Sequence, residues 1–317
     1  MKRSKKRSLD YKYKEMAKKI SARGRFAYGE KKTINQLLRD AEKYLRKRKI
    51  TSARLDAEVI LCFVLAKPRE WLYAHSENQL TNSRIQRFGA LIKKRAGHYP
   101  VAYITNQKEF FGLNFFVNQN VLIPRPETEL LVETAFDIIE HRTGKLVIAD
   151  IGTGSGCLAI AIAKNVKRNL TIYAIDISAP ALANAKKNAE RHQVLSKIKF
   201  YRGNLLKPVR NKKLDVLVAN LPYLDSKTEN LLRSSDSKAL KFEPRIALFG
   251  VADGLNPYRE LFEQISALDR PPRFILLEIG QRQTNRIKKI IEQTLPSARI
   301  EIIKDLAGRD RVVKIEC

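Results

Sequence analysis

Cysteine and histidine are scarce in this 317-residue sequence, and neither is clustered. The three cysteines, Cys62, Cys157 and Cys317, are too far apart to suggest a disulfide framework or a metal-binding spacing. The four histidines are equally scattered, which gives no support to a zinc site or a catalytic histidine. We therefore expect no bound metal and a reducing, cytoplasmic setting.

Long apolar runs are also missing near the N-terminus. The longest one there, residues 59–66, is far shorter than the roughly 20 residues that a membrane-spanning helix needs. The basic N-terminal residues are not followed by the apolar core of a signal peptide. With 44% hydrophobic residues, however, the chain can bury a sizeable core.

Acidic residues are outnumbered almost two to one. The chain has 33 Asp and Glu against 61 Lys and Arg, a net charge of +28. Such a surface attracts phosphate, so an anionic partner or surroundings rich in nucleic acid are expected. The charge does not show that nucleic acid is the substrate, because a general basic bias of the organism's proteins would produce it too.

The basic charge is densest in residues 1–32, where thirteen Lys and Arg accompany three Asp and Glu. Few large apolar residues are present, so this segment is predicted to be a disordered or loosely helical arm. One interpretation of the arm is an electrostatic tether to RNA or the ribosome. The other is a solvated tail.

Residues 33–104 have the pattern of a small helical bundle. Apolar residues recur at helical spacing from Ile34 to Leu45, and Ser52 and Thr81 are candidate N-caps of further helices. This part of the chain carries no catalytic constellation. We expect it to recognise a partner, with a lid or spacer as the alternative.

Residues 105–122 alternate and are rich in phenylalanine, which indicates a β-hairpin or an extended linker. From residue 123 onwards strands and helices alternate, which predicts a doubly wound, mostly parallel α/β sheet of the Rossmann type. The last two strands, residues 299–304 and 311–316, have no helix between them. They are expected to form an antiparallel hairpin within the same sheet.

A glycine loop follows the first strand of this sheet, with the sequence Asp150-Ile151-Gly152-Thr153-Gly154-Ser155-Gly156. Glycines at a strand-to-helix turn let a ligand approach the backbone, and the helix N-terminus favours negative charge. The third glycine comes one residue too early for the dinucleotide motif G-x-G-x-x-G, and Asp150 places a carboxylate where an amine could be held. A ligand with a carboxylate, an amine and a ribose but no pyrophosphate fits best, and S-adenosylmethionine has these groups.

Two further candidate cofactor contacts follow the next strands. Asp176 ends the second strand, 24 residues after Gly152, close to the spacing of about 20 at which a carboxylate meets ribose hydroxyls. An isolated aspartate at such a place is more often a helix cap, but its register with the glycine loop favours the ribose role. Asn204-Leu205, after the third strand, is assigned to the adenine by position alone.

Asn220-Leu221-Pro222-Tyr223 follows the buried strand of residues 214–219. Pro222 cannot donate to a sheet ladder and favours an extended Leu221, so the segment taken alone is a strand that ends in a turn. The alternative is the edge of a pocket, with the Asn220 amide oxygen and the Leu221 carbonyl directed at one point and Tyr223 as a flat face. Two acceptors and a ring suit a planar group with N–H bonds, such as an amide or a nucleobase amine.

Together the glycine loop, Asp176 and residues 220–223 resemble the class I methyltransferases that modify planar nitrogens. The resemblance narrows to the release factor glutamine methyltransferases of the HemK/PrmC type and covers about residues 33–317. It rests further on residues 123–129, Arg54-Leu55-Asp56-Ala57-Glu58, Phe110-Phe111-Gly112, Phe242-Glu243-Pro244-Arg245, Asp253-Gly254-Leu255 and Asp305-Leu306-Ala307-Gly308-Arg309.

The resemblance implies an activity, a cofactor and a partner. Such enzymes methylate the side-chain amide nitrogen of the glutamine in the Gly-Gly-Gln loop of peptide-chain release factors, using S-adenosylmethionine. We expect Asn220 and Leu221 to hold the glutamine amide, Asn220 also to contact the cofactor, Pro222 to stiffen the segment and Tyr223 to pack on the amide plane. The wall of the acceptor pocket is expected to be shaped by three further residues, for which packing and an ion pair are the alternatives: Phe111, Arg125 and Glu127. Nothing in the sequence requires more than a monomer.

The sequence departs from the family pattern at two positions. Leu221 stands where the family has the first proline of Asn-Pro-Pro-Tyr, although its carbonyl is retained, and Asn204 replaces a common acid. The Leu-Pro-Tyr form also resembles rRNA adenine dimethylases, which are not expected to carry residues 123–129 or the helical bundle. An rRNA adenine methyltransferase and a non-catalytic RNA- or ribosome-binding protein are therefore the alternatives.

Overall fold

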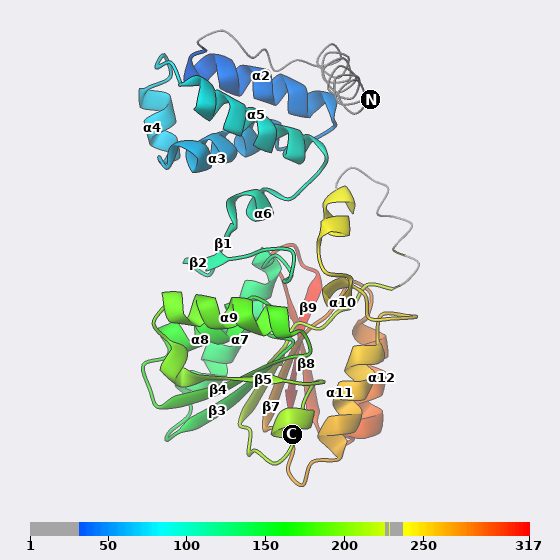
Figure 1. Cartoon of the computed structure of the whole chain (residues 1–317). Coiled ribbons are helices and arrows are strands. Elements are labelled where there is room, and N and C mark those ends of the chain that lie inside the picture. Colours follow the sequence, from blue (N-terminus) through cyan, green and yellow to red (C-terminus); the bar gives the residue numbers. More distant parts are fainter. Residues whose placement is uncertain (1–31, 226–227, 229–236) are drawn as a thin grey trace, which may run out of the picture. The chain divides into compact units, whose positions relative to one another are not determined.

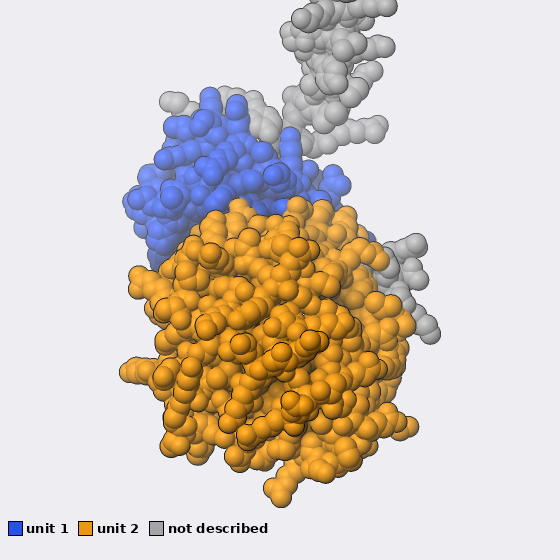
Figure 2. All heavy atoms as spheres, turned by 60° about the horizontal axis from the view of Figure 1, so that its bottom comes forward, with its two compact units in different colours: residues 1–105 blue, residues 106–317 orange. Residues whose placement is uncertain are grey.

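The computed structural model describes residues 32–225, 228 and 237–317 (Figure 1). The chain divides into two compact units, with the boundary between Thr105 and Asn106 (Figure 2). The basic arm expected for residues 1–32 lies outside the described residues, except for Lys32. Within the described part of the chain, no helix is long and apolar enough to cross a bilayer.

The first unit is a helical bundle, as its apolar spacing predicts. Its helices are α2 (Ile34–Lys47), α3 (Ala53–Leu65), α4 (Arg69–Ala74), α5 (Asn82–Ala96) and α6 (Val101–Thr105). Apolar faces of α2, α3 and α5 share one buried core, which includes Leu37, Ile60 and Phe88. The spacing of 3.6 residues per turn is what brings these side chains to the same face of each helix.

Ser52 and Thr81 precede α3 and α5 as predicted, but neither side chain accepts a hydrogen bond from its helix. Ser52 has a ψ of 21°, outside the extended region typical of N-caps, and its hydroxyl donates to Asp56 instead. The prediction of side-chain capping is therefore wrong at both residues, although the helix starts are correct.

Two buried acids of α3 fasten the bundle. Glu58 is 1% exposed and accepts hydrogen bonds from Arg54 and Arg69 at 2.6 Å each. Asp56 accepts from Arg95 of α5 at 2.6 Å. Because buried carboxylates are stable only when paired, these bonds fix α3 against α4 and α5. The acids of this motif thus have a structural task.

The second unit begins with the predicted β-hairpin. Strands β1 (Gln107–Phe110) and β2 (Leu113–Phe116) pair antiparallel around Phe111 and Gly112. Both turn residues have positive φ, 51° and 70°, as tight hairpin turns of type I′ require. Asn188 of helix α9 (Ala179–Arg191) accepts from the Phe116 N–H at 2.8 Å and donates to its carbonyl at 2.9 Å. The hairpin is thereby attached to α9.

A seven-stranded sheet forms the centre of this unit, in the order β5-β4-β3-β6-β7-β9-β8. Five strands are parallel: β3 (Leu146–Ile151), β4 (Leu170–Asp176), β5 (Ile198–Arg202), β6 (Val216–Ala219) and β7 (Phe274–Glu278). The last strand, β9 (Asp310–Glu316), runs antiparallel between β7 and β8 (Arg299–Lys304). The predicted doubly wound, mostly parallel sheet with an antiparallel last strand is confirmed.

Helices cover both faces of the sheet (Figure 1). One face carries α7 (Glu129–Glu140), α8 (Cys157–Asn165) and α9, and the other carries α11 (Asn256–Ser266) and α12 (Thr284–Thr294). Strand residues such as Ile148, Leu217 and Ile275 are fully buried, which is why these strands have continuous apolar sequences. Shorter helices occupy the connections: η1 (Pro126–Thr128), η5 (Ser237–Phe242) and α10 (Arg245–Leu248).

The strand order changes direction between β3 and β6. The chain proceeds outward from β3 through β4 to β5 and then returns to the other side of β3 as β6. In open α/β sheets, ligands bind at the carboxyl ends of the strands at this point. The register pairs Ile151 with Ala219, so the residues that follow them, Gly152 and Asn220, are neighbours. The fold therefore brings the glycine loop and residues 220–223 together.

Candidate active site

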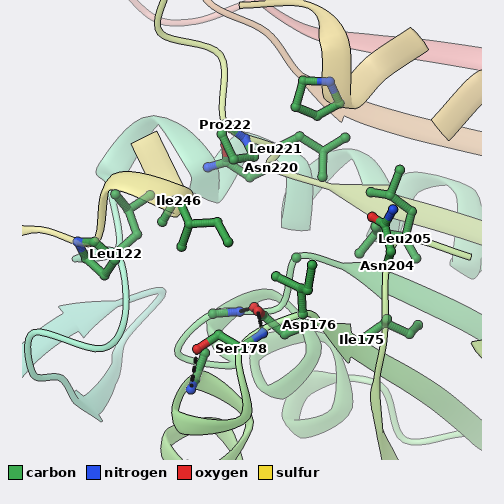
Figure 3. Close-up of a pocket in the computed structure, with 18 of the residues that line it drawn as sticks. Leu122, Ile175, Asp176, Ser178, Asn204, Leu205, Asn220, Leu221, Pro222 and Ile246 are labelled. Atoms are coloured by element: carbon green, nitrogen blue, oxygen red, sulfur yellow. Dashed lines mark hydrogen bonds between the residues drawn. The ribbon is translucent and has the colours of Figure 1, made fainter. Parts of the chain in front are cut away.

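A cavity of about 420 Å³ lies at the carboxyl ends of β3, β4, β5 and β6 (Figure 3). This volume falls within the range of about 300–1,000 Å³ that small-molecule sites occupy. Every one of these strands contributes lining residues that the sequence predicted there: Gly152, Gly154, Asp176, Asn204, Leu205, Asn220, Leu221 and Pro222.

The glycine loop turns the chain from β3 into α8. Gly152, Gly154 and Gly156 have positive φ of 73°, 55° and 81°, a conformation that glycine adopts without strain. The N–H groups of Gly152 and Thr153 donate to a carbonyl of β4, which fastens the loop to the sheet. Gly152 and Gly154 line the cavity, whereas Thr153, Ser155 and Gly156 support the loop without lining it.

Asp150 is fully buried near the end of β3. Its Oδ2 accepts from the Thr153 hydroxyl at 2.6 Å and from the Ala159 N–H of α8 at 3.2 Å. Among the described residues its Oδ1 has no hydrogen-bond partner, and burial raises the pKa of the carboxyl to about 7. Asp150 holds the loop and does not line the cavity, so its contact with a ligand amine stays a prediction.

Asp176 lies at the end of β4, in the cavity wall. Its Oδ2 accepts from the Gly154 N–H at 2.9 Å and its Oδ1 accepts from the Ser178 N–H at 2.8 Å (Figure 3). Burial raises the pKa of this carboxyl. Asp176 therefore joins the glycine loop to Ser178, the N-cap of α9. Its contact with a ribose stays a prediction.

Asn204 and Leu205 follow β5 and line the same cavity. The Asn204 side-chain amide donates to Glu260 Oε1 at 2.5 Å, and Glu260, on α11, is also a lining residue. The carboxylate that the family pattern has at residue 204 is thus present nearby, on a different element.

Asn220 follows β6, and its side chain is hydrogen-bonded to a buried residue of the second unit. Its Nδ2 donates to the Thr128 hydroxyl at 3.0 Å, and that hydroxyl donates to the Glu278 carboxylate at 2.6 Å. Leu221 is 3% exposed, and its carbonyl lies 3.4 Å from the Tyr258 hydroxyl, whose one proton is donated to the Glu278 carbonyl at 2.7 Å. The contact at 3.4 Å therefore uses little of the accepting capacity of the Leu221 carbonyl, which leaves it able to bind another donor.

A second cavity, of about 130 Å³, shares part of its lining with the first. Asn220 and Leu221 line both, and so do Leu122 and Ala247. Asn220 and Leu221 therefore border both cavities. This geometry favours a pocket edge over a strand that merely ends.

Pro222 and Tyr223 complete the segment. Pro222 lines the first cavity and Tyr223 the second. The Tyr223 carbonyl accepts from the Gln283 side chain at 3.0 Å. Burial raises the pKa of the Tyr223 phenol to about 12, so the ring is neutral near neutral pH.

Residues 123–129 are anchored to Glu243, which is 4% exposed. The Ile123 N–H donates to Glu243 Oε2 at 3.0 Å, and the Arg125 guanidinium donates to Oε1 at 2.6 Å. Arg125 thus forms an ion pair between segments, one of the two roles considered for it. It also lines the second cavity, as the other role requires.

Phe111 and Glu127 line neither cavity. Phe111 packs edge-on against Phe136 of α7, with ring centroids 5.7 Å apart, and its N–H donates to Glu129. Because Phe111 lies at the hairpin turn, its ring is directed to α7. This contact is the packing role considered as the alternative to a place in the pocket wall. Glu127 is exposed. A role for these two residues in acceptor binding stays a prediction.

Comparison with known proteins identifies both parts of the chain. Residues 36–105 match the PrmC N-terminal domain, and residues 126–263 match the methyltransferase small domain. A release factor glutamine methyltransferase of Bacillus cereus is 36% identical over 263 residues, which cover 82% of this chain and 91% of that one. The chain belongs to the release factor glutamine methyltransferase family.

Other relatives agree with this assignment. The release factor glutamine methyltransferase of Moorella thermoacetica is also 36% identical, over 88% of this chain and 96% of that one. The family resemblance deduced from the motifs is confirmed, and the chain is a methyltransferase. The crystal structure of the hMettl16 catalytic domain in complex with MAT2A 3'UTR hairpin 6 has a TM-score of 0.55 at 18% identity, over 68% of this chain and 80% of that one. At that identity the likeness shows the fold alone.

In this member of the release factor glutamine methyltransferase family, four residues at or behind the site were not predicted from the sequence as site residues. Glu243 and Glu260 do not follow a strand, so strand ends could not predict them. The fold brings them to Arg125 and Asn204, respectively. Glu278 had a usable signal, since a carboxylate that ends an apolar strand resembles Asp176. Thr128 stood within a motif, but its helix-start position suggested no link to Asn220.

Proposed function

We propose that the chain transfers a methyl group from S-adenosylmethionine to the side-chain amide nitrogen of the glutamine in the Gly-Gly-Gln motif of a peptide-chain release factor. The observation that carries the proposal is that Asn220 and Leu221 line both cavities. An amide in the smaller cavity would meet a methyl donor in the larger one at these residues. The names of the relatives support a release factor as the acceptor.

The residues of the larger cavity fit S-adenosylmethionine. Asp176 accepts two N–H groups in the structure, and a carboxylate has about four accepting positions, so it can also bind ribose hydroxyls. Gly152 and Gly154 let the methionyl part approach the backbone, and Asn204 and Leu205 would hold the adenine. When bound, S-adenosylmethionine would supply an electrophilic methyl group: its carbon–sulfur bond breaks as the carbon–nitrogen bond forms, S-adenosylhomocysteine leaves, and the amide nitrogen releases one proton to solvent.

The chain's own residues must then activate a poor nucleophile, since the lone pair of an amide nitrogen is delocalised. Asn220 Oδ1 and the Leu221 carbonyl accept the two N–H bonds of the glutamine amide. These bonds fix the plane of the amide and stabilise positive charge that grows on its nitrogen. Pro222 stiffens the segment and Tyr223 packs on the amide plane. Positioning and oriented dipoles carry the catalysis.

The proposal is tested by mixing the full chain with a release factor and labelled S-adenosylmethionine. Label is expected in the Gly-Gly-Gln peptide. Asn220→Ala should lower the labelling rate by roughly 100-fold or more, the scale of losing one oriented hydrogen-bonding group. Cofactor affinity, measured by calorimetry, should change little. Asn114→Ala, at an exposed position of the hairpin, is the matched control and should label like the wild type.

Two results would contradict the proposal. Label in rRNA and none in the release factor would make the acceptor a nucleobase. Failure to bind S-adenosylmethionine, together with salt-dependent RNA binding, would favour a non-catalytic RNA-binding protein, the class that the net charge of +28 suggests.

The proposal includes the cellular setting and partners. The cysteines Cys62, Cys157 and Cys317 are free, which supports a reducing, cytoplasmic environment. The release factor is the protein partner, and the basic arm contacts RNA or the ribosome. The chain acts as a monomer.

A further inference from the structure

A chain of hydrogen bonds runs from Asn220 into the interior of the second unit. Asn220 Nδ2 donates to Thr128 Oγ1 at 3.0 Å, and Thr128 Oγ1 donates to Glu278 Oε2 at 2.6 Å. Thr128 is 2% exposed and Glu278 is 1% exposed. The three residues come from the end of β6, from η1 and from the end of β7. The fold therefore brings a shielded threonine and carboxylate to the back of Asn220.

Which group donates and which accepts in these two hydrogen bonds follows from the number of protons that each group has. A threonine hydroxyl has one proton, and here it is given to the Glu278 carboxyl. Burial raises the pKa of this carboxyl to about 7, so above that pH it is ionised and has no proton to give. Towards Asn220 the Thr128 oxygen can then only accept. Asn220 must therefore turn its NH₂ group to Thr128, which leaves its Oδ1 on the other side of the amide.

This constraint matters because the two ends of an asparagine amide are nearly identical in shape. Packing alone distinguishes them poorly, and hydrogen bonds decide which end faces which way. If the Asn220 amide turned over, its N–H groups would face the N–H groups of the substrate glutamine amide. Hydrogen-bond donors would then face each other and repel the glutamine amide, whereas the proposed reaction needs a hydrogen-bond acceptor at this place.

The two arginines near Glu278 form ion pairs with other carboxylates. Arg311 pairs with Asp305 at 3.1 Å, and Arg125 pairs with Glu243 at 2.6 Å. Among the described residues, Thr128 donates the hydrogen bond that the Glu278 carboxylate accepts. The carboxylate is thus available to fix the orientation of this one hydroxyl.

We propose that Thr128 and Glu278 are positioning residues that hold Asn220 with its Oδ1 directed to the acceptor amide. The inference rests on the proposed function for the identity of the acceptor, but the orientation of Asn220 is a property of the protein alone. Thr128 acts through Asn220 and touches neither cavity.

The first test observes the orientation without any reaction. The side-chain amide of Asn220 is followed by NMR in the full chain with asparagine labelled in its side-chain nitrogen, and its signal is assigned by its loss in Asn220→Ala. Thr128→Val and Thr128→Ala both remove the hydroxyl and should shift or broaden that signal, whereas Thr128→Ser should restore it. An unchanged signal in both hydroxyl-free variants would overturn the inference.

The second test separates positioning from stability. Thr128→Val should lower kcat for release factor labelling by roughly 10- to 100-fold, the effect of losing one buried hydrogen bond in the transition state. Cofactor affinity should stay within about two-fold of the wild type, since no cofactor contact is removed. Thr128→Ser should recover most of kcat.

Thr134→Val is the matched control. Thr134 is also buried, at 4% exposure, but its hydroxyl donates to the Leu130 carbonyl within α7. The variant should lose comparable stability and keep kcat. An equal loss of kcat in Thr134→Val and Thr128→Val would assign the effect to stability and overturn the inference. Wild-type protein that labels no release factor would refute the proposed function and leave the NMR test intact.

Discussion

Leu221 contributes its side chain and its backbone to different parts of the molecule. The side chain is 3% exposed, and a methyl group added to Gly152 would lie 3.5 Å from its Cδ2, so it packs beneath the glycine loop. The carbonyl belongs to the proposed acceptor site. Proline, which the family pattern has at this position, keeps the carbonyl and shortens the apolar side chain.

Variants at residue 221 can therefore separate the two contributions. Leu221→Ala should lower the free energy of unfolding by about 2–4 kcal/mol, because it leaves a cavity in the core. Leu221→Pro should retain labelling of the release factor, since the accepting carbonyl is unchanged. Urea unfolding and the labelling assay measure the two effects. Loss of labelling in Leu221→Pro, with normal cofactor binding and stability, would show that the carbonyl is not the contribution that matters.

Two buried carboxyls, Asp150 and Glu278, should make stability depend on pH. Burial raises the pKa of each to about 7, well above the ordinary value for its residue type. The folded state then binds these protons more tightly than the unfolded state does. The stabilisation is fully present below the unfolded-state pKa values and is lost as pH rises through 7. From pH 5 to pH 8.5 the unfolding free energy should fall by an amount on the order of a few kcal/mol.

Chemical denaturation across this pH range is the measurement. Asp150→Asn and Glu278→Gln should each flatten the profile, because each removes one titrating group. His192 titrates in the opposite sense, since burial lowers its pKa, so His192→Gln should steepen the fall. A wild-type profile that is flat or rises between pH 5 and 8.5 would contradict the expectation.

Gly254, in the connection between residues 220–223 and α11, lies close to the backbone of Tyr223. Gly254 has a φ of 78°, and a Cβ added there would overlap the Tyr223 carbonyl oxygen. That oxygen is also held by Gln283, at 3.0 Å. Any side chain at residue 254 must therefore displace the segment that carries Asn220 and Tyr223.

Gly254→Ala should lower the labelling rate by roughly 10-fold or more, because displacement of about 1 Å in a catalytic segment is costly. Gly308→Ala is the matched control, since Gly308 has a similar φ of 74° and open space around an added Cβ. The control should lose about 1–2 kcal/mol of stability from the backbone conformation and keep its activity. Equal activity in the two variants would show that the close approach to Tyr223 is unimportant.

The elements of the second unit could be predicted from the sequence because their signals are local. The strands predicted at residues 214–219, 299–304 and 311–316 lie within two residues of β6, β8 and β9, and the βαβ order predicted the glycine loop, Asp176, Asn204 and Asn220 at one edge of the sheet. Parallel strands with helical crossovers permit few other arrangements. The parts of the site that follow from strand ends were therefore accessible.

Contacts between distant segments were not accessible, because no local pattern encodes them. Thr128 and Glu278 are 150 residues apart, and Arg125 and Glu243 are 118 apart. For Phe111 the sequence left open a place in the wall of the acceptor pocket and a packing role, and in the structure the hairpin turn directs its ring to α7. A side chain's partner depends on how turns and loops aim it, which composition and periodicity do not specify.

The excess of positive charge extends over the whole molecule. Residues 1–31 hold twelve Lys and Arg and three Asp and Glu, so their removal would change the net charge from +28 to +19. The remaining chain is still strongly basic. Charge of this size favours contact with RNA through counterion release and makes such contact sensitive to salt.

A chain that lacks residues 1–31 should therefore bind RNA with a weaker salt dependence while it labels the release factor as the full chain does. Each phosphate contact contributes about 0.7 to the slope of log K against log salt on single strands, so losing several contacts is measurable. A second variant, in which the twelve basic residues of this segment are replaced by glutamine, keeps the length and removes the charge. It should behave like the deletion, because the expected contact is electrostatic. If both variants keep the slope of the full chain, RNA contact belongs to residues 32–317, and if labelling falls in both, the segment serves the release factor instead.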